Sequence, residues 1–175
     1  MFDPAGPVLG IDPGLSRCGY GAVRRDGRRL AATACGVIRT PPDAPLPERL
    51  AALEADLEAF VADVHPRALA VERVLFQTNV RTAIAVGQAS GIALAVAARA
   101  GLPVTHYSPN EVKLAVTSNG AAGKAQVQAM VARLLDLDVA PPPDAADALA
   151  LAVCHLWRAP LQAGVDRAVA AKAAE

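Results

Sequence analysis

Short apolar runs separated by turn residues recur along the first two thirds of the chain. They predict five strands, at residues 8–12, 19–25, 29–38, 68–72 and 104–106. Asp26-Gly27 is a typical two-residue hairpin turn, so the second and third strands should run antiparallel. Pro13-Gly14 stops the first strand immediately after Asp12. Three antiparallel strands therefore open the fold.

Apolar residues at helical spacing predict the other elements. Helices are expected at residues 46–64, 79–99, 124–135 and 144–158, and a further one begins at Ser108. Its start, Ser108-Pro109-Asn110-Glu111, is a capping box with proline at the first helical position. Residues 159–175 are rich in Ala and have no apolar face, so we predict a flexible C-terminal tail.

The predicted order of elements is βββαβαβααα. Hairpin-linked strands followed by alternating strands and helices indicate an α/β fold, with a mixed sheet and helices on both of its faces. We expect residues 1–158 to form one domain.

Composition supports a globular cytoplasmic protein. Of the 175 residues, 53% are hydrophobic and 19% are charged, which excludes a disordered chain. Cys18, Cys35 and Cys154 form no ligand cluster, and we interpret them as buried hydrophobes in a reducing compartment. The start lacks a basic region, and no apolar run reaches the ~18–20 residues that a membrane span requires.

The charge is unevenly distributed although the net charge is zero. Residues 43–63 carry six acids and one base, whereas residues 73–133 carry six bases and one acid. Such a chain can still present a basic face to phosphates. Two of the three lysines, Lys113 and Lys124, lie in the basic block. The four arginines around the hairpin turn are expected to be solvated (Arg24, Arg25, Arg28 and Arg29).

Four acids stand out by position. Asp12 and Glu72 end predicted strands, at the edge where open α/β sheets bind ligands. Asp144 and Asp147 lie three residues apart, on one face of a helix's first turn. Singly, each such acid is more often a cap than a catalyst. Together they could converge.

Four converging carboxylates repel one another unless cations lie among them. Oxygen ligands without His or Cys favour Mg²⁺ or Mn²⁺ over zinc. Such a site can hold two metal ions and displace a group at phosphorus. The pattern therefore favours phosphodiester hydrolysis.

Several segments, in order over residues 8–158, resemble the RuvC crossover-junction endonucleases. They are Gly10-Ile-Asp-Pro-Gly14, Gly19-Tyr-Gly21, Val71-Glu-Arg-Val74 with Asn79, Gly87-Gln-Ala89 with Gly91, Val112-Lys113, Gly123-Lys124-Ala-Gln-Val127 and Asp144-Ala-Ala-Asp-Ala-Leu-Ala150. The resemblance implies an RNase H-like homodimer that nicks two opposed strands of a Holliday junction in recombination and repair. It further implies Mg²⁺, two ions per site with Mn²⁺ able to substitute, and the partners RuvA and RuvB.

The resemblance also implies roles for individual residues. The catalytic and metal-binding acids are Asp12, Glu72, Asp144 and Asp147, and Lys113 and Lys124 contact DNA. Arg73, Phe76 and Asn79 are further DNA-binding candidates. Family members often have an aromatic residue three positions after the Glu72 acid, where this chain has Leu75. Phe76 is therefore the candidate for stacking on an unpaired base, with a core role as the alternative.

Two questions stay open at this stage. The small residues Gly87, Ser90, Gly91 and Ala95 allow close approach either to the sheet or to a second subunit. A non-catalytic or RNA-directed nucleic-acid-binding protein on the same fold is the rival function, although retention of all four acids opposes the non-catalytic version.

His155 is expected to pack in the core rather than to bind a metal ion. An ATP-binding site of the sugar-kinase type is excluded by length, and a Walker loop by spacing.

Overall fold

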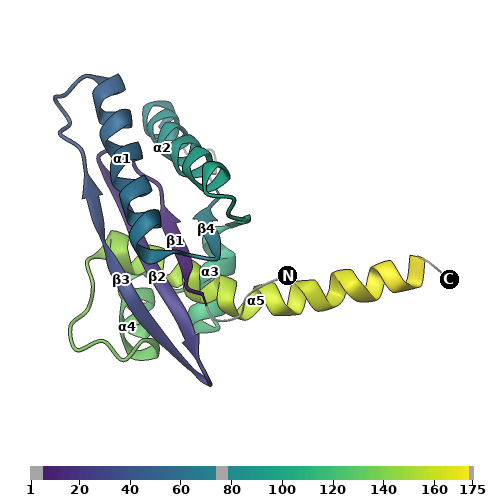
Figure 1. Cartoon of the computed structure of the whole chain (residues 1–175). Helices are drawn as coiled ribbons and strands as arrows, with labels where there is room; N and C mark the ends of the chain where they lie inside the picture. The colour runs from purple at the N-terminus through teal and green to yellow at the C-terminus, as the bar shows by residue number, and fades with distance from the viewer. Residues whose placement is uncertain (1–5, 74–78, 174–175) are drawn as a thin grey trace.

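The computed structural model describes residues 6–73 and 79–173, with side chains described up to residue 159. The order of elements is the predicted one (Figure 1). The elements are β1 (Val8–Asp12), β2 (Arg17–Asp26), β3 (Arg29–Arg39), α1 (Leu46–Val64), β4 (Ala68–Glu72), α2 (Val80–Arg99), β5 (Val104–Tyr107), α3 (Pro109–Thr117), α4 (Lys124–Leu134) and α5 (Pro143–Ala173).

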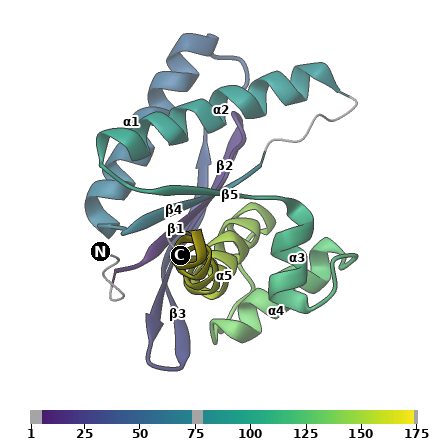
Figure 2. The same ribbon diagram turned by 90° about the vertical axis from the view of Figure 1, so that its right-hand side faces the viewer.

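The strands form one mixed sheet in the order β3-β2-β1-β4-β5. β1 pairs antiparallel with β2 and parallel with β4, and β4 pairs parallel with β5. Helices α1 and α2 cover one face, while α3, α4 and α5 lie on the other (Figure 2). The predicted fold class is confirmed.

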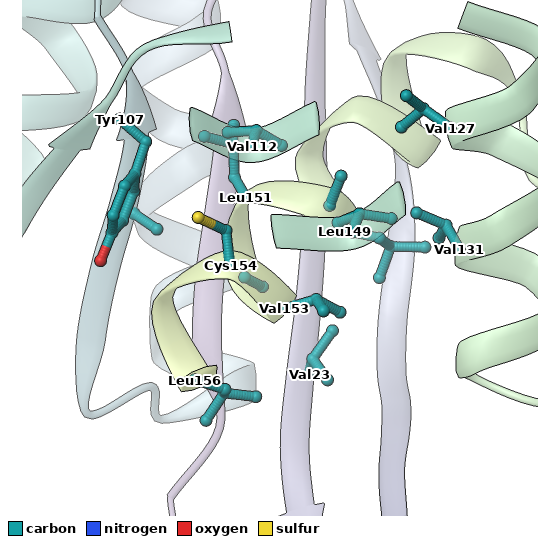
Figure 3. Close-up of a cluster of buried hydrophobic side chains, with 14 of the residues drawn as sticks. Val23, Tyr107, Val112, Val127, Val131, Leu149, Leu151, Val153, Cys154 and Leu156 are labelled. Atoms are coloured by element: carbon teal, nitrogen blue, oxygen red, sulfur yellow. The ribbon is translucent and has the colours of Figure 1, made fainter. Parts of the chain in front are cut away.

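Helix α5 is the centre of the larger hydrophobic core. Most of its residues between 145 and 156 are fully buried. Leu149 and Val153 of α5 lie among side chains from the sheet and from α3 and α4, including Val23 and Val131 (Figure 3). This alternation of Ala with Leu and Val lets the helix lie close to the sheet on one side and hold the two small helices on the other.

Glycines in β1 and β2 allow α5 to lie directly against the backbone of these strands. A Cβ added at Gly10 would lie 1.9 Å from the carbonyl oxygen of Ala148, and one at Gly21 would lie 2.7 Å from Leu149 Cγ. A Cβ at Gly19 would lie 2.1 Å from the carbonyl oxygen of Asp144. Only glycine permits this approach, because the obstructing atoms at Gly10 and Gly19 are backbone atoms that cannot rotate away.

The second core lies between the sheet and α1 and α2. Leu9 and Ile11 of β1 pack there with Leu53 and Leu57 of α1. Helix α2 is long and apolar enough to cross a membrane by length and composition, so the expectation that no such run exists is wrong. It packs on α1, and a row of its residues including Ala93 and Ala97 is buried in this core. We therefore interpret α2 as a core helix.

Two further predictions are wrong. Helix α5 does not end near Arg158 but continues to Ala173, and its C-terminal part projects away from the sheet (Figure 1). An Ala-rich sequence has high helix propensity, so it forms helix without an apolar face to dock. Cys35 is exposed, unlike the buried Cys18 and Cys154, because it lies on β3 at the edge of the sheet.

Candidate active site

The sheet brings Asp12 and Glu72 together. The parallel register pairs Ile11 with Val71, so the next residues, Asp12 and Glu72, leave neighbouring strands side by side at the same edge. Their carboxyl groups lie close enough to shift each other's pKa: Glu72 helps to raise that of Asp12, and Asp12 lowers that of Glu72. Two interacting carboxyl groups are unfavourable when both carry a charge.

Helix α5 adds the other two acids. Its first turn lies against β2 at Gly19, directly beside the Asp12 position in the antiparallel register. Asp144 and Asp147 are both close enough to Asp12 for their charges to raise its pKa. Acids from β1, β4 and α5, which are far apart in sequence, therefore lie in one region.

A cavity of about 260 Å³ opens between these acids and helices α3 and α4. Asp12, Glu72 and Asp147 line it together with Lys113 of α3 and Lys124 of α4. The rest of the wall is mostly apolar, from Pro109, Val112, Val127 and Leu151. Acids and lysines therefore lie in one partly buried cavity, where their electrostatic interactions are stronger than in bulk water.

Burial, followed by neighbouring charges, shifts the pKa of three of the acids. Burial, followed by the charges of Glu72 and Asp147, raises the pKa of Asp12 from 3.8 to about 7. Burial also raises the pKa of Glu72, although the interaction with Asp12 opposes this. The pKa of Asp147 is raised by burial as well, against the opposing effect of Lys124. Burial is thus the main cause in all three cases, and Lys113 and Lys124 oppose it only in part at Glu72 and Asp147.

Two basic residues pair with the α5 acids. The Lys124 ammonium lies 3.4 Å from Asp147 Oδ2, and its side chain is 81% exposed. Arg17, the first residue of β2, donates from Nε to Asp144 Oδ2 at 2.6 Å. In the described parts of the chain, no three His, Cys, Asp or Glu side chains are close enough, as they stand, to hold one metal ion.

The donor chemistry nevertheless fits a divalent cation. All four acids offer only oxygen ligands, which Mg²⁺ and Mn²⁺ prefer. The raised pKa of Asp12, Glu72 and Asp147, caused first by burial and then by neighbouring acids, means that their charged forms are poorly stabilised by the protein alone. A cation among these carboxylates would reduce their mutual repulsion and would stabilise their charged forms, which burial disfavours.

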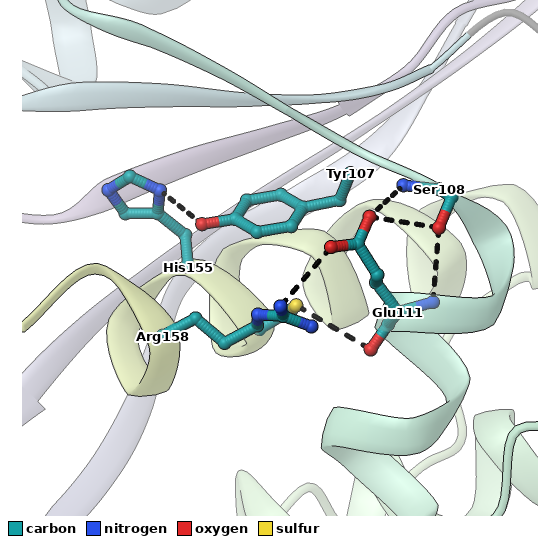
Figure 4. A network of polar contacts seen from close by, with 6 residues as sticks. Tyr107, Ser108, Glu111, His155 and Arg158 are labelled. Atoms are coloured by element: carbon teal, nitrogen blue, oxygen red, sulfur yellow. Dashed lines mark hydrogen bonds and ion pairs between the residues drawn. The ribbon is translucent and has the colours of Figure 1, made fainter. Parts of the chain in front are cut away.

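Helix α3, which carries Lys113, is anchored to α5 through Glu111 of its capping box. Ser108 and Glu111 form the predicted box, and Glu111 also accepts an ion pair from Arg158 of α5 at 3.2 Å (Figure 4). Next to it, the Tyr107 hydroxyl and His155 Nδ1 are hydrogen-bonded at 3.1 Å. These contacts fix α3 against α5, and so fix Lys113 relative to the α5 acids.

Arg73 and Asn79 do not line the cavity. Arg73 follows Glu72 and is exposed. Asn79 caps α2 by accepting a hydrogen bond from the Thr82 amide, which is a structural role. Phe76 lies outside the described residues. His155 is buried, and burial lowers its pKa to about 4, so it packs as a neutral ring.

Sequence reasoning missed Arg17. Its contact with Asp144 joins residues 127 positions apart, and no spacing rule connects them. The available signal was its place at the start of the strand that follows the Asp12 turn. The link from Glu111 to Arg158 was missed as well, because the capping box explains Glu111 without a distant partner.

The family described as "Crossover junction endodeoxyribonuclease RuvC" matches residues 8–155. A protein of that description from Streptomyces avermitilis is 54% identical over 170 residues, covering 96% of this chain and 97% of the relative. One from a Nocardioides species is also 54% identical and covers 94% of each chain.

Solved structures give the same similarity in three dimensions. The structure of Thermus thermophilus RuvC in complex with a Holliday junction substrate has a TM-score of 0.85 at 36% identity, and covers 90% of this chain and 96% of that one. The yeast mitochondrial Holliday junction resolvase Ydc2, at 15% identity and a TM-score of 0.66, covers 93% and 84% and supports the RNase H-like fold alone.

The pKa of Asp12 predicts a pH dependence of stability. Between pH 3.8 and about 7 the folded state keeps a proton that the unfolded chain has lost, so the free energy of unfolding falls as pH rises through this window. A three-unit shift corresponds to at most about 4 kcal/mol. Asp12→Asn cannot hold this proton, so its free energy of unfolding should not show this fall. The free energy of unfolding of Asp12→Asn minus that of wild type should therefore increase as pH rises toward 7 and stay constant above it.

Denaturant titrations in EDTA from about pH 5 to about pH 8 measure this difference. Asp138→Asn, which removes an exposed acid away from the cavity, is the matched control and should follow the wild-type curve. Parallel curves for Asp12→Asn and wild type would show that Asp12 does not hold the proton.

Proposed function

The chain belongs to the RuvC family of crossover junction endodeoxyribonucleases, and on this basis we propose that it resolves Holliday junctions. The proposed reaction is hydrolysis of one phosphodiester bond in each of two opposed DNA strands, during recombination and repair. The catalytic residues are Asp12, Glu72, Asp144 and Asp147.

One observation carries this proposal: acids and lysines line the same cavity. Lys113 and Lys124 can bind the phosphates of a DNA strand, and they lie within the same cavity as Asp12, Glu72 and Asp147. The lysines would hold the strand so that a phosphate lies at the acids, and the apolar wall would limit the water around it.

We propose that the four acids hold two Mg²⁺ ions, which Mn²⁺ can replace. A bound divalent cation supplies charge stabilisation to a phosphate under attack. The contribution of the chain is to place oxygen ligands from three separate elements in one region. Lys124 keeps its positive charge for the phosphate, because the charge of Asp147 raises its pKa.

The cavity favours an enzyme over a purely nucleic-acid-binding protein. Buried acids repel phosphates, so a protein that only bound nucleic acid would gain affinity by losing them. Here burial raises the pKa of three of the four. Such an arrangement is useful only if cations join the acids, as they do in hydrolysis at phosphorus.

We further propose that the protein is a homodimer, because two opposed strands require two sites. Helix α2 leaves a stripe of residues exposed at helical spacing, at positions 80, 84, 87 and 91. Val80 is 70% exposed and Ile84 is 56% exposed. A Cβ added at Gly87 or Gly91 would meet nothing within 4 Å, so these glycines do not serve packing on the sheet.

Family membership supports the remaining proposals. RuvA and RuvB are proposed as branch-migration partners, and a DNA substrate agrees with the proposed cytoplasmic location. Arg73 is proposed to contact DNA because it is exposed next to Glu72. Phe76 and Asn79, in the segment between Glu72 and α2, are proposed to contact DNA near the crossover.

The proposal predicts metal-dependent cutting of a four-way junction. With Mg²⁺ or Mn²⁺, the wild-type protein should nick two opposed strands of a labelled synthetic junction, at sites that DNA ligase can reseal. Asp12→Asn should bind the junction at least as tightly, because it removes a negative charge, yet cut it at least ~100-fold more slowly, since even loss of outer-shell metal partners has effects of about 10- to 100-fold.

Asp138→Asn controls for loss of an exposed acid and should cut normally. Full cutting by Asp12→Asn would refute the site. Equal cutting of linear duplex would refute the choice of substrate, and preferential cutting of an RNA junction would favour the RNA-directed alternative.

The dimer proposal predicts the effect of a charge on α2. Wild-type protein should elute in size-exclusion chromatography with light scattering at twice the mass of one chain. Ile84→Glu should elute as a monomer, because a charge buried in an apolar interface is strongly unfavourable. Val139→Glu, at a loop residue that is 79% exposed, is the matched control and should stay dimeric. A monomeric wild type, or a dimeric Ile84→Glu, would contradict the proposal.

A further inference from the structure

Two arginines lie directly opposite each other beside the site. The antiparallel register of β2 and β3 pairs Arg17 with Arg39, and both residues are exposed. Residues 17, 19 and 21 alternate onto the face of the sheet that α5 covers, as the glycine approaches and the Arg17 contact with Asp144 show. A directly opposed residue shares its partner's face, so Arg39 points to the same side.

Like charges opposite each other across two strands are unfavourable unless an anion compensates them. Asp144 compensates Arg17. Arg39 has no ion pair within the described ranges of the chain. Of the two positive charges of this pair, one is therefore left without an ion-pair partner among the described residues.

The position of the pair is complementary to that of the lysines. Asp12 and Glu72 end the neighbouring strands β1 and β4, and the start of β2 and the end of β3 lie beside the end of β1. Lys113 of α3 and Lys124 of α4 line the cavity together with the acids, whereas Arg17 and Arg39 do not line it. Cations from two separate parts of the fold thus lie near the acids.

Arg17 and Lys124 make equivalent contacts. Each is a solvent-accessible cation on one of the two α5 acids, Arg17 on Asp144 and Lys124 on Asp147. Arg17 is 46% exposed even in this contact. A guanidinium has five donors in a planar arrangement, so it can remain at a carboxylate and still donate to a phosphate.

We propose that Arg17 and Arg39 bind backbone phosphates of the DNA strand on the β2–β3 side of the active site. This inference rests on the proposed function, because it takes the substrate to be DNA. The strand would then be held at two places near the acids, by the arginine pair and by the lysines. Two fixed contacts define the direction of a strand through the site, whereas one contact does not.

The test is the salt dependence of junction binding in EDTA, measured by fluorescence anisotropy, so that neither metal nor cutting affects the result. The plot of log K against log salt has a negative slope, and each lost phosphate contact makes this slope shallower by about 0.9. Arg17→Gln and Arg39→Gln should each show this loss and bind several-fold more weakly, and Lys124→Gln serves as the reference for a phosphate contact. Arg39→Lys should retain the wild-type slope.

Arg28→Gln is the matched control. It removes the same charge from an exposed arginine of the same hairpin, at the turn, which is the opposite end from the site. Its slope should equal that of wild type. Because Arg39 touches no acid of the site, its variant separates phosphate binding from any effect on Asp144.

The outcomes distinguish the two proposals. If wild-type protein binds and cuts the junction but Arg17→Gln or Arg39→Gln keeps the wild-type slope, the arginine pair is overturned and the proposed function stands. An equal loss in Arg28→Gln would also overturn it, because the effect would then be one of total charge. If wild-type protein neither binds nor cuts the junction, the proposed function fails and this inference fails with it.

Discussion

The close approach of α5 to β1 and β2 is the contact on which the site depends. The backbone of α5 lies against Gly10 and Gly19, where a Cβ would be 1.9 Å and 2.1 Å from carbonyl oxygens of the helix. No other residue type would allow the first turn of α5 to reach the end of β1. Two of the four acids are on that turn, so without this contact only Asp12 and Glu72 would remain together.

That geometry has an electrostatic consequence. Burial, followed by the charges of neighbouring acids, raises the pKa of Asp12 to about 7. The surrounding cations, Lys113, Lys124 and Arg17, all come from elements that pack on or beside α5. The same packing therefore assembles a negative centre and a positive border, which is the charge arrangement needed to hold a cation and a phosphate next to each other.

Much of this could be predicted from local signals. The hairpin turn, the apolar runs and the capping box fix the elements, and the meeting of parallel strand ends predicts that Asp12 and Glu72 lie together. The roles of Gly10 and Arg17 could not be predicted, because each depends on a residue more than 100 positions away. The helix beyond Arg158 was missed because the absence of an apolar face says nothing about Ala-rich helix propensity. The division of the chain at residue 158 stays a prediction.

The claim that four acids from three elements form one cation site is tested most directly by crystallography with Mn²⁺. Anomalous difference density identifies manganese independently of any activity. We predict a peak in contact with carboxylate oxygens of Asp12, Glu72 and at least one of the α5 acids. Well-ordered side chains with no manganese peak between them at saturating Mn²⁺ would contradict the account.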